Sequence, residues 1–248
     1  MAEDGTHMAL AWGTAPAPQR GPKRAFALEQ VLDAALTIAD ADGLDAVTMP
    51  SVASALGLTA MSLYRYVGSK DALVLLLQDH AMGPPPDVIG PGLGWRPGLE
   101  AYAAASTAVY RKHPWMLDIP IVGVARTPNN LAWFDAGLGT LAKEALTPEE
   151  RMAIVLEVSG HARFRASVER GYDDLARTTK RSSTKTATEE ARVLREVVDE
   201  ERLPHLSELL EAGALVSETF DGGRYALDRL LDGVEYHLAK PARTTEDG

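Results

Sequence analysis

Residues 58–70 gather hydroxyl, phenol and cationic side chains that can contact the phosphates and base edges of a nucleic acid. Thr59, Ser62 and Tyr64 each carry an O–H group that can donate or accept a hydrogen bond, and Lys70 adds a positive charge. No acidic residue lies between Leu58 and Lys70, so this stretch contains nothing that repels phosphate. These residue types favour contact with a polyanion.

Two short helices joined by a tight turn would present these side chains. Thr48 and Thr59 can each accept a hydrogen bond from a free N–H group at the start of a helix. Gly57 can adopt the left-handed conformation that ends the first helix, and Ala53 lets the two helices approach closely while Leu63 faces inward. This pattern predicts a helix-turn-helix, whose second helix enters the major groove of DNA.

Further helices are expected on both sides of this motif. Residues Leu28 to Asp42 repeat apolar side chains at helical spacing and stop at Gly43. Ser69 can cap a helix that runs from Lys70 to about Ala81. Because this last helix is apolar on most sides, we expect it to lie wedged between two domains.

Beyond a Gly- and Pro-rich segment that ends at Pro97, the apolar spacing again predicts helices, and no alternating strand pattern occurs. The predicted helices are Leu99 to His113, Asn129 to Ala145, Pro148 to Arg170, Glu189 to about Ala212 and Gly223 to Ala239. The expected fold class is therefore all-α.

The sequence suggests two domains joined by a helix and flanked by tails. The expected parts are a flexible N-terminal tail (1–22), a helix-turn-helix DNA-binding domain (23–69), a connecting helix (70–82), a ligand-binding and dimerisation domain (98–240) with a mobile loop near 178–188, and a flexible C-terminal tail (241–248). The loop is rich in Ser, Thr, Lys and Arg, which leaves a basic nucleic-acid patch as a less favoured interpretation.

Composition narrows the function further. The chain has 248 residues, 46% of them hydrophobic, and no cysteine, which suits one or two globular domains and excludes disulfides and thiolate chemistry. No apolar run could span a membrane, and no phosphate loop or nucleophile elbow is present. Because residues 1–22 contain no apolar secretory core, we expect no secretory leader. We therefore expect a cytoplasmic protein that is not an enzyme.

The net charge of −10 argues at first against nucleic acid. Basic and acidic side chains balance between Arg20 and Lys70, however, so the acidic excess lies elsewhere in the chain. A DNA-binding segment that is locally neutral to basic can still bind phosphate although the rest of the chain is acidic. We then expect contacts to few phosphates and an affinity that depends strongly on salt concentration.

The block from Ala35 to Leu73 resembles the DNA-binding domain of tetracycline-repressor-like (TetR family) transcriptional regulators. The segments that carry the resemblance are Ala34-Ala35-Leu36 with Gly43-Leu44, Thr48-Met49-Pro50-Ser51-Val52-Ala53, Leu56-Gly57-Leu58, Leu63-Tyr64-Arg65-Tyr66-Val67 and Lys70-Asp71-Ala72-Leu73. The remainder, to Ala239, is similar to the C-terminal domain of the subgroup nearest the tetracycline repressor. Its segments are His113-Pro114-Trp115, Thr147-Pro148-Glu149-Glu150, Ser159-Gly160-His161 and residues 225–233.

The resemblance implies a set of DNA-contacting residues. They are Arg24, Thr48, Thr59, Ala60, Met61, Ser62, Tyr64, Tyr66 and Lys70. Pro50 departs from relatives that carry a polar side chain reaching DNA at that position, and Ala60 and Met61 offer only apolar contact, for example to a thymine methyl group. We therefore expect little direct base readout and a large share of affinity from phosphate contacts and DNA shape.

The same resemblance implies that a small amphipathic organic effector binds in the helical domain. The candidate residues are Trp115, Asn130, Trp133, Phe134, Leu156, His161 and Arg165, although Trp and Phe at helical spacing more often belong to the core. The histidine that holds a magnesium chelate in tetracycline repressors has no confident match here. Glu157 and His161 share a helix face, but two ligands do not make a metal site, so we expect no metal and no cofactor.

Two apolar stripes can serve either this chain's own core or a dimer interface. One follows Pro148, and the other runs from Leu227 to Leu238. Their pattern alone favours the core, while reading two DNA half-sites requires a two-fold molecule and favours a homodimer.

Together these features predict a homodimeric, ligand-responsive regulator that binds double-stranded operator DNA, most simply a repressor that its effector releases. The alternative is a small-molecule-binding or sequestering protein with weak or no specific DNA binding. An enzyme built on helices has little support, because no catalytic motif is present.

Overall fold

The computed structural model describes residues 8–14, 26–90, 92–121, 123, 126–180, 182–216 and 220–240. Within these ranges the regular elements are all helices, with no strand, which confirms the all-α prediction. The chain forms two compact units, of which unit 1 ends at Arg163 and unit 2 begins at Phe164. This boundary lies within one long helix, α8 (Pro148–Thr179).

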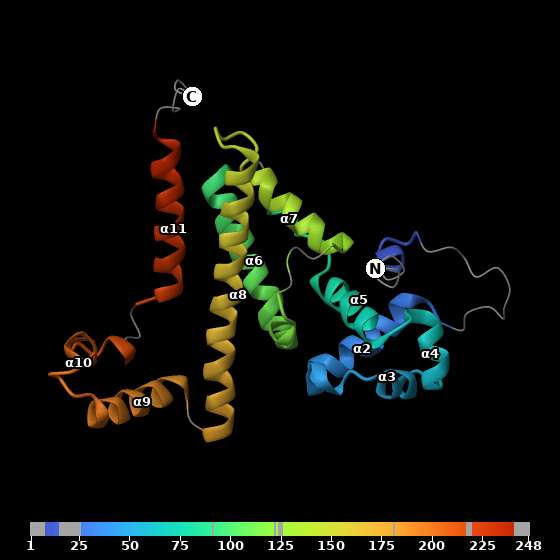
Figure 1. Cartoon of the computed structure of the whole chain (residues 1–248), viewed down its shortest axis with the longest axis horizontal. Helices are drawn as coiled ribbons and strands as arrows, with labels where there is room; N and C mark the ends of the chain where they lie inside the picture. The colour runs from blue at the N-terminus through green and yellow to red at the C-terminus, as the bar shows by residue number, and fades with distance from the viewer. Residues whose placement is uncertain are drawn as a thin grey trace. The chain divides into compact units, whose positions relative to one another are not determined.

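The head of unit 1, residues 26–69, is a small helical bundle, drawn in blue and cyan in Figure 1. Its elements are α2 (Leu28–Asp42), the 3-10 turn η1 (Leu44–Ala46), α3 (Met49–Ala55) and α4 (Ala60–Val67). They enclose the fully buried Val31, Val52 and Leu63. The predicted first helix is confirmed from Leu28 to Asp42.

The rest of unit 1 is built on longer helices. They are α5 (Lys70–Met82), α6 (Trp95–Lys112), the 3-10 turn η2 (Pro114–Asp118), α7 (Pro128–Thr140) and the first half of α8 (Pro148–Thr179). Helix α5 packs against α2 and α4 of the head on one side and against α7 on the other. Helix α7 is shorter than predicted, because it gives way to turns after Thr140.

Helices α6, α7 and α8 approach closely where glycine takes the place of a larger residue. A Cβ on Gly137 of α7 would lie 2.8 Å from Cγ1 of Val155 and 3.2 Å from Cε2 of Tyr102. A Cβ on Gly98 of α6 would lie 2.8 Å from Cγ2 of Thr140. Both distances near 2.8 Å are shorter than carbon atoms tolerate, so the missing side chains permit this packing.

Unit 2 differs most from the sequence-based expectation. Its elements are the second half of α8, α9 (Ser183–Val197), α10 (Pro204–Glu211), the 3-10 turn η3 (Ala214–Val216) and α11 (Gly222–Leu238). The single helix expected from Glu189 to Ala212 is wrong, because the chain leaves α9 after Val197 and starts α10 at Pro204. Proline lacks the N–H of a helix interior and disfavours helical backbone in the residue before it.

The expected loop at 178–188 is also corrected, since most of it is helical. Helix α8 continues past Arg170 to Thr179, and α9 begins at Ser183 with the Ser182 hydroxyl accepting a hydrogen bond from the N–H of Lys185. Three threonines of this segment fit a helix because their hydroxyls donate to carbonyls four residues earlier. They are Thr178, Thr179 and Thr188, each with an oxygen-to-oxygen distance of 2.8 Å.

The close packing at Gly137 is testable with a matched glycine on the same helix. Gly137→Ala should lower the free energy of unfolding by about 1–3 kcal/mol, because the new methyl group has no space. Gly139→Ala, whose Cβ would meet nothing within 4 Å, should leave stability unchanged or raise it by up to about 1 kcal/mol. Urea unfolding followed by circular dichroism measures both, and equal stabilities would contradict this account of the packing.

Candidate nucleic-acid interface

Local hydrogen bonds set the geometry of the α3–α4 pair. Thr48 caps α3 by accepting from the N–H of Ser51 at 3.1 Å, and the Ser51 hydroxyl accepts from the N–H of Thr48 at 2.9 Å. The turn follows at Gly57, whose φ of 67° is left-handed, and the N–H of Leu58 reaches back 2.8 Å to the carbonyl of Ala53. This closes α3 as a Schellman motif, so the caps and the glycine turn predicted from sequence are confirmed.

Helix α4 presents one free face while its other face is buried. Leu63 and Val67 belong to the core of the head, whereas Met61 is 68% exposed and Tyr64 is also exposed. Thr59 caps the helix through the N–H of Ser62 at 3.2 Å. The structure therefore brings Thr59, Ala60, Met61, Ser62 and Tyr64 together at the start and exposed face of α4.

The remaining DNA candidates lie at the borders of this surface or inside the head. Lys70 is exposed at the start of α5, and Thr48 lies half-buried before α3. Tyr66 is only 7% exposed, and its hydroxyl accepts a hydrogen bond from the N–H of Phe26 at 3.2 Å. Tyr66 thus ties α4 to the start of α2, a structural role that the sequence did not reveal. Arg24 lies outside the described residues.

A carboxylate of α2 attaches the head to the next part of unit 1. Oδ1 of Asp40 accepts a hydrogen bond from Nδ1 of His113 at 2.7 Å and another from Nε1 of Trp115 at 2.7 Å. His113 is 2% exposed, and Trp115 belongs to the same hydrophobic core as the head. Two N–H groups that would be costly to bury alone are therefore satisfied by one acceptor.

Helix α8 holds η2 from the other side. The guanidinium of Arg163 donates to the carbonyl oxygens of Leu117 at 2.8 Å and Ile119 at 2.7 Å. It also lies over the ring of Tyr110, 5.7 Å from the ring centroid. A continuous set of contacts therefore leads from α8 through η2 to Asp40 in the head.

A second carboxylate joins α5 to α7. Asp79 is buried, and its Oδ1 accepts from the N–H of Asn129 at 2.9 Å and the N–H of Asn130 at 3.1 Å. Thr127, the residue at the cap position, makes no side-chain capping bond. Asp79 therefore caps α7 from another helix, and its negative charge suits the positive end of the α7 dipole.

Aromatic side chains complete the junction beside α7. Nε1 of Trp133 donates to the carbonyl of Gly83 at 2.9 Å, and its ring meets that of Tyr102 edge to face at 6.0 Å. The Tyr102 hydroxyl lies 2.9 Å from Oγ of Ser159. Burial raises the pKa of Tyr102, while the hydrogen bond with Ser159 acts in the opposite direction.

The effector candidates fall into different environments. Trp115, Asn130 and Trp133 make the hydrogen bonds of the two junctions. Phe134 and His161 are half-buried, and Leu156 is exposed on α8. Arg165 pairs with Glu169 and Asp221 in unit 2. The sequence did not single out Asp40, Asp79 or Arg163, because nothing local marks their distant partners.

In the described part of the chain, no three metal-binding side chains converge, and Glu157 and His161 therefore have no third partner of that kind. None of the helices described is both long and apolar enough to cross a bilayer.

The Asp79 cap is testable by removing the carboxylate. Asp79→Ala should lower the free energy of unfolding by roughly 2–3 kcal/mol, because it leaves the partly buried N–H groups of Asn129 and Asn130 in α7 without their charged acceptor. Asp71 lies at the exposed start of α5, the helix that also carries Asp79, and Asp71→Ala should lower the free energy of unfolding by less than about 1 kcal/mol. Thermal and urea unfolding compare the two, and similar losses would contradict a specific capping role.

Two family descriptions match this chain. "Bacterial regulatory proteins, tetR family" matches residues 31–77, and "Tetracyclin repressor-like, C-terminal domain" matches residues 90–238. The HTH-type transcriptional repressor DrrR1 of Streptomyces coeruleorubidus is 33% identical over 237 residues, which make up 93% of this chain and 85% of DrrR1.

Solved structures share the fold. Apo ActR from Streptomyces coelicolor superposes with a TM-score of 0.68 at 22% identity, covering 89% of this chain and 100% of ActR. ActR in complex with actinorhodin gives a TM-score of 0.66 at 21% identity, with coverages of 89% and 100%. The helix-turn-helix of α3 and α4, the helical domain that follows and these matches lead to one conclusion: the chain belongs to the TetR family and is a DNA-binding transcriptional regulator.

Proposed function

We propose that the protein is a homodimeric repressor, acting in the bacterial cytoplasm, that a small amphipathic organic effector releases from its operator. The observation that carries this proposal is the exposed face of α4, held on a rigid, capped helix-turn-helix. The similarity of the whole chain to DrrR1, which is described as a repressor, supports repression and not activation of transcription. ActR, which shares the fold, binds actinorhodin in one of its structures, which supports an organic effector.

In this proposal α4 enters the major groove and the flanking residues bind phosphate. Tyr64 and Ser62 offer hydrogen bonds, and the exposed thioether of Met61 offers an apolar contact. Lys70 and Thr48 lie at helix starts, where a phosphate oxygen is favoured, and Arg24 adds a cation before α2. Since few of these groups read base edges, binding should depend strongly on salt and DNA shape.

A dimer would supply the second reading helix. Unit 2 exposes large apolar side chains on α8 and α11, namely Phe164, Val168, Tyr172, Tyr225 and Tyr236. Such side chains suit an interface between two copies of the same helices. Two α4 helices would then meet half-sites about one helical turn apart, roughly 34–36 Å.

The effector would act through the two junctions. The head is attached at Asp40, and Arg163 of α8 holds the turn that carries its partners. Trp115, Asn130 and Trp133 belong to these junctions, so a ligand that displaces them would move the head. We propose that Phe134, Leu156, His161 and Arg165 contribute to the same response. Operator and effector must then weaken each other's binding reciprocally.

Removing the exposed phenol of α4 tests the reading helix. Tyr64→Ala should weaken binding to the promoter DNA beside the protein's own gene by about tenfold or more, the size of a lost base or phosphate contact. Fluorescence anisotropy at several salt concentrations measures this, and sedimentation velocity should report an unchanged dimer.

Val88→Ala is the control, because Val88 is exposed in the loop after α5 and lies outside the proposed DNA surface. If Tyr64→Ala binds operator like the parent, α4 is not the reading helix. If the parent itself shows no specific, salt-dependent affinity for this DNA, the protein is instead a sequestering protein.

Loss of the Asp40 acceptor tests the junction. Asp40→Ala should leave the side chains of α4 in place but weaken operator binding about three- to tenfold, because the head is no longer held in one orientation. Amide hydrogen exchange should accelerate in α2 and η2. Asp42→Ala, exposed on the same helix, should behave like the parent. Parent-like exchange and affinity in Asp40→Ala would show that the junction does not orient the head.

A further inference from the structure

We propose that unit 2 holds a second ligand site, a cavity between the end of α8 and α9 that binds an apolar molecule carrying a primary ammonium group. The cavity has a volume of about 580 Å³, within the range of pockets that take small organic molecules. Its lining residues are Leu175, Thr179, Thr186, Glu189, Glu190, Val193 and Leu194, and none of them belongs to the effector set proposed above.

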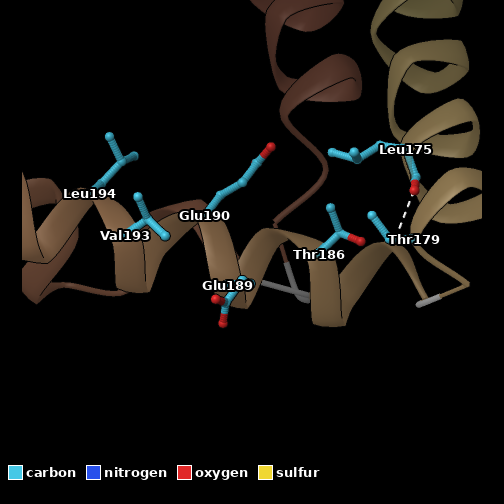
Figure 2. A pocket seen from close by; sticks show the side chains of 7 residues that line it. All are labelled: Leu175, Thr179, Thr186, Glu189, Glu190, Val193 and Leu194. Atoms are coloured by element: carbon cyan, nitrogen blue, oxygen red, sulfur yellow. Dashed lines mark hydrogen bonds between the residues drawn. The ribbon is translucent and has the colours of Figure 1, made fainter.

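The walls of this cavity are mostly apolar. Figure 2 shows Leu175 extending from α8 toward the side chains of Val193 and Leu194 on α9. Val193 is exposed at this site, so apolar surface is left in contact with solvent. A hydrocarbon portion of a ligand would gain by covering this surface.

One hydroxyl in the wall lacks the partner that its neighbours have. The hydroxyls of Thr179 and Thr188 each donate to a carbonyl four residues earlier, both at 2.8 Å. Thr186 is 5% exposed, and its Oγ1 has no hydrogen-bond partner in the described structure. Burying an unpaired hydroxyl is unfavourable, so a ligand that donates to Oγ1 of Thr186 would be stabilised there.

The charge of the cavity selects a cation. Its ionisable lining residues are two glutamates, with no lysine or arginine among the lining residues. Glu189 is paired with Arg192 at 2.7 Å and points away from the other lining side chains in Figure 2. Glu190 forms no ion pair among the described residues and lies on the same side of α9 as Val193 and Leu194.

Thr186 and Glu190 stand four residues apart on α9, so they are neighbours on one helix face. A single ammonium group can donate one N–H to the Thr186 hydroxyl and another to the Glu190 carboxylate. The apolar body attached to it would then lie against Leu175, Val193 and Leu194. This arrangement favours a primary amine over a quaternary one, which has the charge but no N–H to donate.

Three probes of equal chain length test this assignment on the full-length protein without DNA. Decylammonium, decyltrimethylammonium and decanoate are titrated below their micelle concentrations by isothermal titration calorimetry. Decylammonium should bind about tenfold more tightly than decanoate, because only the cation can pair with Glu190. It should also bind more tightly than decyltrimethylammonium. Equal affinities for the three probes would overturn the proposal.

Variants of α9 locate the binding. Glu190→Gln should remove the preference for the cations, and Thr186→Val should weaken decylammonium while leaving decyltrimethylammonium unchanged. Glu196→Gln, a charge-matched control on the same helix outside the lining residues, should bind like the parent. Val193→Trp should block all three probes by filling the mouth.

If Glu190→Gln and Val193→Trp both bind decylammonium like the parent, the probe binds elsewhere and the site is disproved. Circular dichroism checks the fold of each variant, and because Glu190 is exposed, its variant tests the proposal even if Val193→Trp misfolds. Because the probes are titrated without DNA, the result of the titration does not depend on whether the protein is a repressor.

Discussion

The two hydrogen bonds that Asp40 accepts decide how the reading head is attached. His113 and Trp115 bring bulky aromatic rings into the core that α2 shares with η2, and each ring carries an N–H that water can no longer reach. One carboxylate satisfies both, so α2 and η2 must keep their relative position. Since α3 packs on α2 and α4 packs on α3, the direction in which α4 points follows from this junction, and Arg163 extends the constraint into α8.

Helix α4, the proposed reading helix, carries one cation, Arg65, and no acidic residue. An acidic chain with a net charge of −10 cannot rely on long-range attraction to a polyanion. The head presents an acid-free helix with hydroxyls at its start, and the exposed side chains of that helix are Met61, Tyr64 and one cation, Arg65. Such a surface gains affinity from close fit, helix N-termini and DNA shape, which makes the orientation set by Asp40 and Asp79 more important.

Unit 2 carries features that a purely structural element has no reason to keep. Thr186 buries a hydroxyl without a partner, and Glu190 places a charge beside an apolar cavity. A valine in place of Thr186 would keep the side-chain shape without a buried unpaired hydroxyl, and a glutamine in place of Glu190 would remove the charge. Departures of this kind are common at binding sites, where the ligand supplies the missing contacts.

The sequence alone was sufficient for the caps and stops of the head. Thr48, Thr59 and Ser69 act on N–H groups three residues away, and Gly57 acts on its own turn, so short-range patterns reveal them. Residues 178–188 were predicted to be a loop from their many hydroxyl side chains, but most of them are helical, because a hydroxyl-rich segment is compatible with either structure.

Tertiary structure alone decided which polar side chains meet. Asp40 lies 73 residues before His113, and Asp79 lies 50 residues before Asn129, so no local pattern links them. Tertiary structure also decided that Tyr64 is exposed while Tyr66 is buried. Residues two positions apart lie on nearly opposite sides of a helix, and only the packing of the helix shows which side is buried.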